Sequence, residues 1–154
     1  MKSKNLILVS FSDFTLTLTK NGEQFVFPIS CAKNGLGEKS GSEKTPRGMH
    51  KICKKIGANA EIGAVFKSRK QTGETCDFNN DNLGENLILT RILWLDGLEK
   101  QNESTKNRYI YIHGTNCEDA VGKIHFSHGC VVMKNADILR LFNLVKAEDY
   151  VFIY

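Results

Sequence analysis

The sequence predicts a mainly β domain with a single helix near its C-terminal end and a long loop excursion in the middle. Apolar and polar residues alternate with a period of two through the first thirty residues, which is typical of half-buried strands. Two further segments, 87–95 and 109–113, have the composition of strands, and 136–145 has the apolar spacing of a helix. At 154 residues the chain is long enough for one domain with a core, so we expect a single domain over residues 1–154.

The N-terminal segment predicts a meander of strands. Leu16 and Leu18 point to one face of an extended chain, and the threonines beside them point to the other face. Asn21 and Gly22 then form the strongest two-residue hairpin signal, because both residue types tolerate a positive φ. Apolar residues recur at alternate positions over 25–29, so a return strand is expected there.

Loops interrupt this pattern between residues 33 and 86. Residues 33–48 are rich in glycine, serine and lysine, and they end in the motif Thr-Pro-Arg-Gly at 45–48. A strand is expected to resume at 49–56. Residues 57–86 are polar and punctuated by glycine without a clear period, and an excursion of that length is usually a lid over a site or a disordered insert.

The second half of the chain predicts the remaining strands and the helix. Residues 87–95 are almost continuously apolar and predict a buried strand, with a core helix segment as the alternative for so short a run. Alternation along 109–113 places His113 on the same face as Tyr109 and Tyr111. Asn135 is a suitable N-cap for a helix at 136–145, and the last five residues are expected to close the sheet. The inward stripe of that helix is formed by Ile138, Leu139, Leu141 and Phe142.

Composition and charge exclude several classes of protein. The net charge of +4 is spread along the chain, which is too weak and diffuse for a nucleic-acid-binding protein but suits a small ligand with several carboxylates. No segment has the length of a membrane span, and the apolar run at 6–9 is too short for a signal peptide. Five cysteines without a C-x-x-C pair fit reduced thiols, so we expect a cytoplasmic protein.

The most informative motif is Ser127-His128-Gly129-Cys130, preceded by His113 at the end of a predicted strand. A free cysteine has a pKa of about 8.5, so only a small fraction is thiolate at neutral pH unless a neighbouring histidine takes the proton. A glycine beside the cysteine allows backbone N–H groups to point at a developing oxyanion. This combination favours a cysteine nucleophile over a buried, inert cysteine.

These residues belong to a longer set of motifs. His113-Gly114-Thr115-Asn116 precedes the Ser-His-Gly-Cys motif, and Met-x-Asn-x-Asp follows it at 133–137. Together with Thr-Pro-Arg-Gly-x-His-x-Ile at 45–52, this set resembles the L,D-transpeptidase family, whose catalytic domain is called YkuD. The segments 62–66 and 89–95 look like a compact branch of that family that lacks signal peptides and resembles cytoplasmic L,D-carboxypeptidases. The resemblance covers nearly the whole chain and implies a β-sandwich-like catalytic domain.

The resemblance also implies roles for individual residues. Cys130 corresponds to the nucleophile and His113 to the general base. Ser127 or a backbone carbonyl would orient the imidazole, and His128 and Gly129 would shape the turn. The backbone N–H groups of Gly129 and Cys130 are the expected oxyanion hole.

One position departs from the family pattern. The family often has an arginine two residues after the cysteine, where this chain has Val132. If such an arginine binds a substrate carboxylate, another cation must replace it, and Arg91 and Arg47 are the candidates. Tyr111 and His50 are further candidates for lining the substrate cleft, with packing in the sheet as the alternative for both.

The implied reaction needs no metal and no cofactor. Its substrates are peptidoglycan stem peptides, cleaved between the diamino acid at position three and the terminal D-Ala through a thioester on the cysteine. Water would resolve that thioester in an L,D-carboxypeptidase, and the amine of a second stem would resolve it in an L,D-transpeptidase that forms 3-3 cross-links. The expected cytoplasmic location favours hydrolysis of muropeptides in murein recycling.

Two alternatives from other classes stay open. A zinc site is chemically plausible, although the spacing of its ligands matches no common zinc finger and His128-Gly129-Cys130 is too tight for two ligands of one ion. That set would consist of His113, Cys117, His125, His128 and Cys130. A peptidoglycan-binding domain without catalytic activity is the second alternative, because of Val132. The sequence leaves the oligomeric state undetermined.

Overall fold

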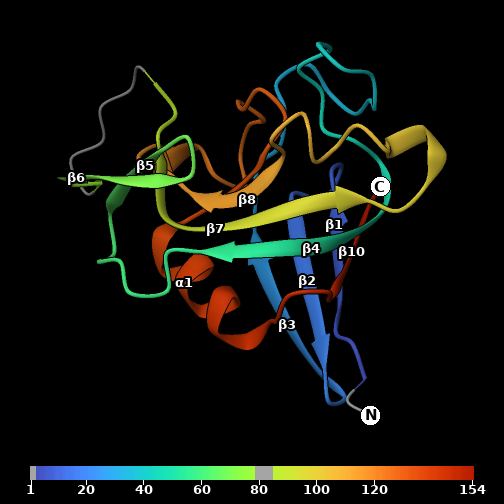
Figure 1. The fold of residues 1–154 in the computed structure, drawn as a ribbon, viewed down its shortest axis with the longest axis horizontal. Coiled ribbons are helices and arrows are strands. Elements are labelled where there is room, and N and C mark those ends of the chain that lie inside the picture. Colours follow the sequence, from blue (N-terminus) through green and yellow to red (C-terminus); the bar gives the residue numbers. More distant parts are fainter. Residues whose placement is uncertain (1–2, 79–84) are drawn as a thin grey trace.

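A computed structural model describes residues 3–78 and 85–154 of the chain (Figure 1). Within these residues ten strands form one sheet, accompanied by a single α-helix and two short 3-10 helices, Lys100–Asn102 and Glu118–Ala120. The prediction of a mainly β fold with one helix near the C-terminal end is therefore confirmed. Within the described part of the chain, no helix has the length and apolar character needed to cross a membrane.

The N-terminal meander consists of β1 (Leu6–Ser10), β2 (Thr15–Lys20) and β3 (Glu23–Pro28). Each strand is antiparallel to the next. Asn21 and Gly22 connect β2 to β3 with φ angles of 52° and 80°, as expected for a two-residue hairpin turn. The predicted hairpin is confirmed.

The central strands join this meander to the second half of the sheet. The order is β3-β2-β1-β10-β4-β7-β5-β6, where β4 is Gly48–Ile56, β7 is Ile88–Gly97 and β10 is Tyr150–Ile153. The C-terminal strand β10 lies between β1, to which it is parallel, and β4, to which it is antiparallel. It therefore closes the sheet at its centre, where it links the two halves, and not at an edge.

The excursion at 57–86 contains more structure than the sequence predicted. Strands β5 (Ala64–Lys67) and β6 (Lys70–Thr75) form a hairpin that pairs with β7 through β5. The sequence signal was weak because every residue of β6 is exposed and only alternate residues of β5 are buried. Residues 79–84, the remainder of the excursion, lie outside the described residues.

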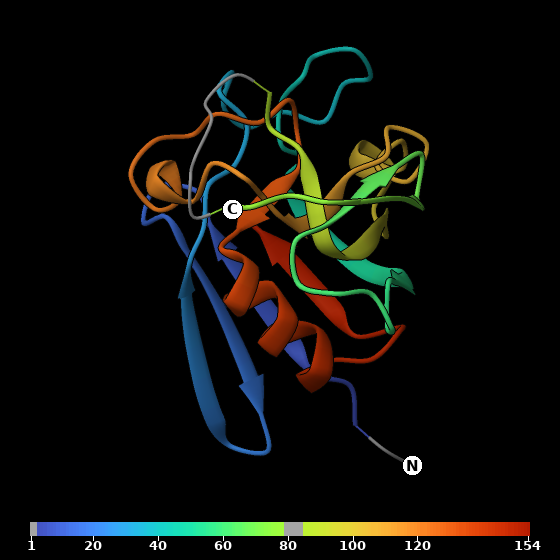
Figure 2. The same cartoon turned by 90° about the vertical axis from the view of Figure 1, so that its left-hand side faces the viewer.

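The helix α1 (Asn135–Leu144) contacts β7 and β8 (Figure 2). It begins one residue earlier than predicted: Lys134 is the N-cap, and Asn135 is buried in the first turn. The Asn135 amide donates to Thr115 O at 2.7 Å, and its oxygen accepts from Thr90 Oγ1 at 2.6 Å, so the side chain joins the helix to β7 and is unavailable for capping. Of the predicted stripe, Leu139 is only half-buried.

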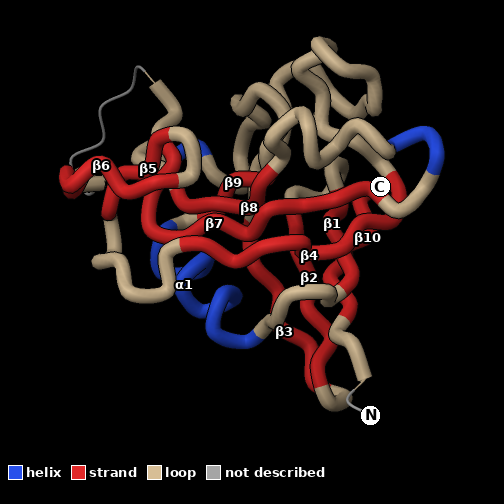
Figure 3. Tube along the Cα trace, in the orientation of Figure 1, coloured by secondary structure: helices blue, strands red, loops and turns tan. Residues whose placement is uncertain are grey.

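The main core lies between the two halves of the folded sheet and α1. In Figure 3 the meander runs steeply while β4 and β7 run across it, and this arrangement leaves an apolar interior between them. Side chains from both halves and from α1 meet there without solvent exposure, including Ile7, Leu16, Leu93, Leu95, Ile112, Met133, Ile138 and Leu141. A smaller cluster on the opposite face of β7 contains Ile92 and Tyr111, and Cys130 packs against it.

Candidate active site

The residues 127–130 form a tight turn that we call the nucleophile turn. Gly129 has a φ of 140°, and a Cβ atom at this position would lie 2.8 Å from Ile110 Cδ1, so only glycine fits. The Ser127 hydroxyl donates to Cys130 O at 2.6 Å and accepts from the Gly129 N–H at 3.2 Å. The serine therefore holds the turn in shape.

The loop before β4 stabilises the nucleophile turn through hydrogen bonds of Thr45. The Thr45 hydroxyl donates to Gly129 O at 2.9 Å and accepts from the Ala32 N–H at 2.9 Å. Thr45 is fully buried, so both hydrogen bonds are shielded from water. The threonine of the Thr-Pro-Arg-Gly motif thus positions the turn that carries the cysteine.

The Cys130 sulfur lies against the start of β8 (Tyr111–Gly114), which is antiparallel to β7 and parallel to β9 (Val131–Met133). The Tyr111 N–H donates to Sγ at 3.3 Å, and Sγ donates to Tyr109 O at 3.6 Å. Burial raises the pKa of the Cys130 thiol to about 11, although the Tyr111 N–H and the charge of Arg108 act in the opposite direction. The resting thiol is therefore protonated at neutral pH and needs a base.

His113 lies on the same face of β8, one step of two residues beyond Tyr111, or roughly 7 Å along the strand. Its Nδ1 is 2.6 Å from Gly114 O, which favours the tautomer with the proton on Nδ1 and a free lone pair on Nε2. Burial lowers the pKa of this imidazole to about 4, so it is neutral at pH 7. A neutral imidazole of this tautomer is equipped to accept a proton through Nε2.

Two details of this arrangement bear on the expected roles. The group that contacts the imidazole is the Gly114 carbonyl, while the hydroxyl of Ser127 stays within the nucleophile turn. In the described residues no hydrogen bond joins His113 to Sγ. The Gly129 N–H, expected in the oxyanion hole, already donates to Ser127 Oγ. A shift of the turn would be needed to free that donor for substrate.

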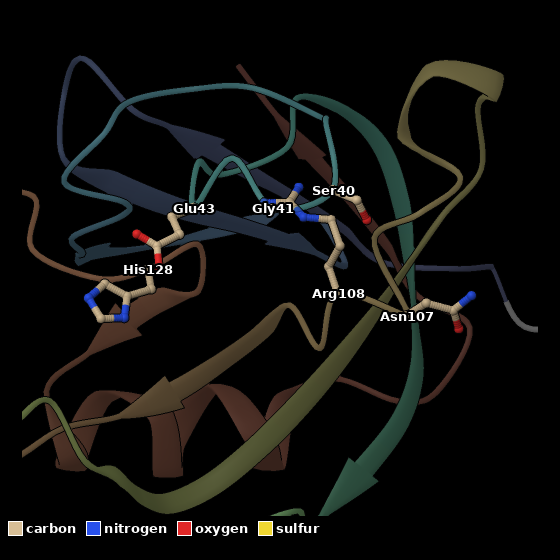
Figure 4. Close-up of a pocket in the computed structure, with 6 residues that line it drawn as sticks. All are labelled: Ser40, Gly41, Glu43, Asn107, Arg108 and His128. Atoms are coloured by element: carbon tan, nitrogen blue, oxygen red, sulfur yellow. The ribbon is translucent and has the colours of Figure 1, made fainter.

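A shallow pocket of about 310 Å³ opens beside the nucleophile turn (Figure 4). It is lined by Ser40, Gly41, Glu43, Asn107, Arg108 and His128. His128 is exposed at its rim, while the Arg108 guanidinium donates to Lys44 O at 2.6 Å and so ties the 33–48 loop to the start of β8. Acidic, basic and uncharged polar side chains line the pocket, which suits a peptide with charged ends or side chains.

The family model of YkuD, the L,D-transpeptidase catalytic domain, matches residues 4–153, which is almost the entire chain. The chain belongs to the L,D-transpeptidase (YkuD) family. The membership expected from the motifs is confirmed, and with it the class of enzyme.

Solved structures agree with this assignment at the level of the fold. L,D-transpeptidase 3 from Mycobacterium tuberculosis, in complex with a faropenem-derived adduct, is 17% identical with a TM-score of 0.62 over 97% of this chain and 60% of that one. An L,D-transpeptidase from Xylanimonas cellulosilytica is 16% identical with a TM-score of 0.61 over 100% and 62%, respectively. An L,D-transpeptidase from Mycobacterium smegmatis is 17% identical with a TM-score of 0.61 over 98% and 58%. The chain thus spans about 60% of the length of these proteins. A search of curated protein sequences gives no match.

The two arginines expected to bind substrate in this YkuD domain lie elsewhere. Arg91 is 6% exposed; its guanidinium donates to the carbonyls of Thr90 and Ala60 and lies 5.4 Å from the Phe142 ring, on the α1 side of the sheet. Arg47 forms an ion pair with Glu38 at 2.9 Å within the 33–48 loop. Backbone carbonyls therefore hold one guanidinium, and a carboxylate holds the other.

His50 and Tyr111 differ in their relation to the site. His50 is fully buried, and its two nitrogens contact Gly48 O at 3.0 Å and Thr105 Oγ1 at 3.1 Å, so it packs between β4 and the segment after β7. Its side chain does not line the pocket beside the nucleophile turn. Tyr111 lies at the site, since its N–H contacts the sulfur and its hydroxyl accepts from Arg69 at 3.1 Å.

Sequence reasoning missed two arginines of the site, Arg69 and Arg108. Arg69 is in the polar excursion, which has no clear period, and the strand that directly follows Arg69 has no buried residue. Arg108 directly precedes the predicted strand at 109–113. Its contact with the nucleophile turn forms only in the folded chain, where its Nη2 lies 3.8 Å from the position that a Cβ atom on Gly129 would occupy.

The zinc alternative finds no support in the arrangement of its ligands. Over residues 3–78 and 85–154, no three His, Cys, Asp or Glu side chains come together as a metal site. The His125 ring stacks between Phe11 and Phe14, with centroids at 3.7 Å and 4.0 Å. Its nitrogens contact the Cys31 N–H and Phe11 O, so its hydrogen-bonding capacity is filled by the backbone.

Proposed function

We propose that this YkuD domain cleaves the peptide bond before the terminal D-Ala of a peptidoglycan stem tetrapeptide, through a thioester on Cys130 that water resolves. The observation that carries the proposal is the position of the thiol. A tight turn at Gly129 brings the Cys130 sulfur against Tyr111, on the side of β7 and β8 that also carries a neutral, buried His113. A nucleophile and a base on one face are the minimum that acyl transfer needs.

The reaction follows from these groups. As Sγ of Cys130 attacks the scissile carbonyl, Nε2 of His113 accepts the thiol proton. The proton passes directly, or after substrate binding has brought the two groups together. The tetrahedral intermediate collapses, the C–N bond breaks, and the imidazolium returns the proton to the departing amine of D-Ala. Nε2 of His113 then takes a proton from the water that attacks the thioester and passes it to the leaving sulfur, which regenerates the thiol and releases the tripeptide as a carboxylic acid that ionises in solvent.

The surroundings of the thiol favour water over a second peptide. On one side, the pocket at Arg108 and His128 is open and can hold the acyl part of the substrate. On the other side, Arg69 at the tip of the β5–β6 hairpin lies over the rings of Trp94 and Tyr109. We expect the space for the departing residue, covered in this way, to hold one residue and, after that residue has left, a water molecule. It should hold the side chain of a second stem peptide less readily.

Mass spectrometry of the products from a disaccharide tetrapeptide tests the proposal, with and without a second stem as acceptor. We expect tripeptide and free D-Ala in both reactions, and no product with Cys130→Ala. Cys53→Ala, which removes a half-buried thiol from β4, is the matched control and should keep full activity. A cross-linked dimer would establish transpeptidation instead. Full activity of Cys130→Ala would refute the mechanism, and binding without turnover by the wild type would indicate a non-catalytic domain.

A further inference from the structure

The tip of the β5–β6 hairpin, formed by Ser68 and Arg69, places a guanidinium on the residues that contact the catalytic sulfur. The Arg69 Nη1 donates to the Tyr111 hydroxyl at 3.1 Å. The guanidinium carbon lies 4.6 Å from the Tyr109 ring centroid and 5.2 Å from that of Trp94. Tyr109 and Tyr111 are the same two residues whose backbone groups contact Sγ, so Arg69 lies one side chain away from the thiol.

The backbone of this tip is unusual for its sequence. Ser68 and Arg69 have φ angles of 50° and 67°, the left-handed region that two-residue hairpin turns require and that Asn and Gly adopt most readily. Serine and arginine are costly residues in this conformation. The hairpin gains little from packing of β6, whose side chains are all exposed. The contacts of the Arg69 side chain therefore offset the conformational cost of this turn.

The charge of Arg69 has no anionic partner within residues 3–78 and 85–154. Three of the other arginines already have partners, since Arg47 pairs with Glu38 and backbone carbonyls hold Arg91 and Arg108. Stacking on two rings leaves most of the five N–H donors of a guanidinium available, and a carboxylate is the ligand that fits them best.

We propose that Arg69 binds the terminal carboxylate of the peptide substrate and makes the domain select peptides that end one residue beyond the bond cleaved. This inference rests on the proposed function, because it takes Cys130 as the attacking group. With the acyl part of the peptide in the pocket at Arg108, the residue after the scissile bond extends toward Tyr109 and Tyr111. Its carboxylate then meets the guanidinium that these side chains already orient.

Binding by a domain that cannot turn over tests this inference without relying on activity. Trp94 is the only tryptophan in the sequence and contacts Arg69, so its fluorescence reports ligand at this position. In a Cys130→Ala background, we compare the Kd of a stem tetrapeptide acid with that of the same peptide ending in a carboxamide. We expect the acid to bind about 10- to 100-fold more tightly, the range of a charge-assisted hydrogen-bonded pair.

Variants at the tip separate the charge from the structure. Arg69→Ala should bind both peptides equally, and Arg69→Lys should restore part of the preference because it keeps the charge without the planar donor pair. Arg140→Ala, which removes an arginine stacked at 5.2 Å on Phe25 away from the site, should keep the wild-type ratio. Equal binding of acid and amide with Arg69 present, or an unchanged ratio in Arg69→Ala, would overturn the inference. Absence of tripeptide formation by the wild type would instead refute the proposed function, so the two failures are distinguishable.

Discussion

The two faces of the sheet at β7 and β8 have different roles: one packs in the core, and the other carries the candidate site. On one face, Leu93, Leu95 and Ile112 are completely buried against α1 and the N-terminal meander. On the other face, Tyr111 contacts the Cys130 sulfur through its N–H, and His113 follows two residues further along β8. Neighbouring residues of the same strand therefore serve opposite purposes: the helix face supplies stability, and the site face holds reactive groups that burial destabilises.

The site face also contains the costly features of the structure. The charged forms of Cys130 and His113 are both disfavoured by burial, since the pKa of the thiol is raised to about 11 and that of the imidazole is lowered to about 4. Positive φ angles occur at Ser68, Arg69 and Tyr109, all around the thiol. Mutations on the two faces should therefore separate activity from stability.

The largest effect is expected for His113→Ala, which removes the base. We expect kcat to fall by roughly 10²–10⁴, the usual loss for a general base. His50→Gln is the matched control, because this second buried histidine contacts Gly48 O and Thr105 and lies outside the pocket. Release of D-Ala from the tetrapeptide measures both. Wild-type kcat in His113→Ala, or an equal loss in His50→Gln, would show that the two faces are not specialised as described.

The protonation state of the resting site gives the next largest effect. With a thiol pKa of about 11, the thiolate fraction rises tenfold per pH unit, so alkylation of Cys130 by iodoacetamide should accelerate about 10³-fold from pH 7 to pH 10 without a plateau. Peptide mass spectrometry distinguishes Cys130 from the other four cysteines. A plateau below pH 8 would indicate a thiolate–imidazolium pair in place of a neutral thiol and a neutral base.

On the helix face, Leu141→Ala should reduce the free energy of unfolding by about 2–5 kcal/mol, because Leu141 is fully buried between α1 and the sheet. The folded fraction should retain its kcat, since the side chain lies on the far face from the thiol. Urea unfolding, with turnover measured well below the transition, checks both statements. A large loss of kcat with little loss of stability would contradict the division between the faces.

The sequence predicted the helix face and the catalytic motif more completely than the rest of the site. Periodicity identifies β2 and α1 because burial on one side imposes a pattern of apolar residues, and a continuous apolar run identifies β7, whose central residues are buried on both faces. The Ser-His-Gly-Cys motif predicts a cysteine nucleophile because local turn chemistry requires those residue types in sequence. Arg69 and Arg108 left no such signal, since each lies in a polar loop and extends a long side chain, Arg69 to Tyr111 and Arg108 to the nucleophile turn.

The same reasoning explains why the sequence did not predict the hydrogen-bond partners of Arg91 and Asn135. An arginine in an apolar strand suggests a functional charge, yet the Arg91 guanidinium donates to the carbonyls of Ala58 and Ala60 in the β4–β5 connection, inside the fold. An asparagine before a helix suggests a cap, yet Thr90, Thr115 and Glu118 engage its side chain. Both residues are hydrogen-bonded by partners distant in sequence, which no local pattern encodes.

The smallest effect is expected for Arg47→Ala, and it sharpens the comparison between arginines. The Arg47 side chain is 57% exposed and pairs with Glu38, whose pKa this arginine lowers, and solvent screens most of the energy of such a pair. We expect the Tm to stay within error of the wild type and KM for the tetrapeptide to change by less than about twofold. The Glu38→Gln variant, which removes the partner and leaves the guanidinium free, should behave in the same way. A rise in KM in Arg47→Ala that Glu38→Gln does not reproduce would mean that Arg47 leaves its ion pair to bind substrate. Carboxylate recognition would then be shared between the loop before β4 and the hairpin tip, instead of resting on the arginine that lies over the rings beside the thiol.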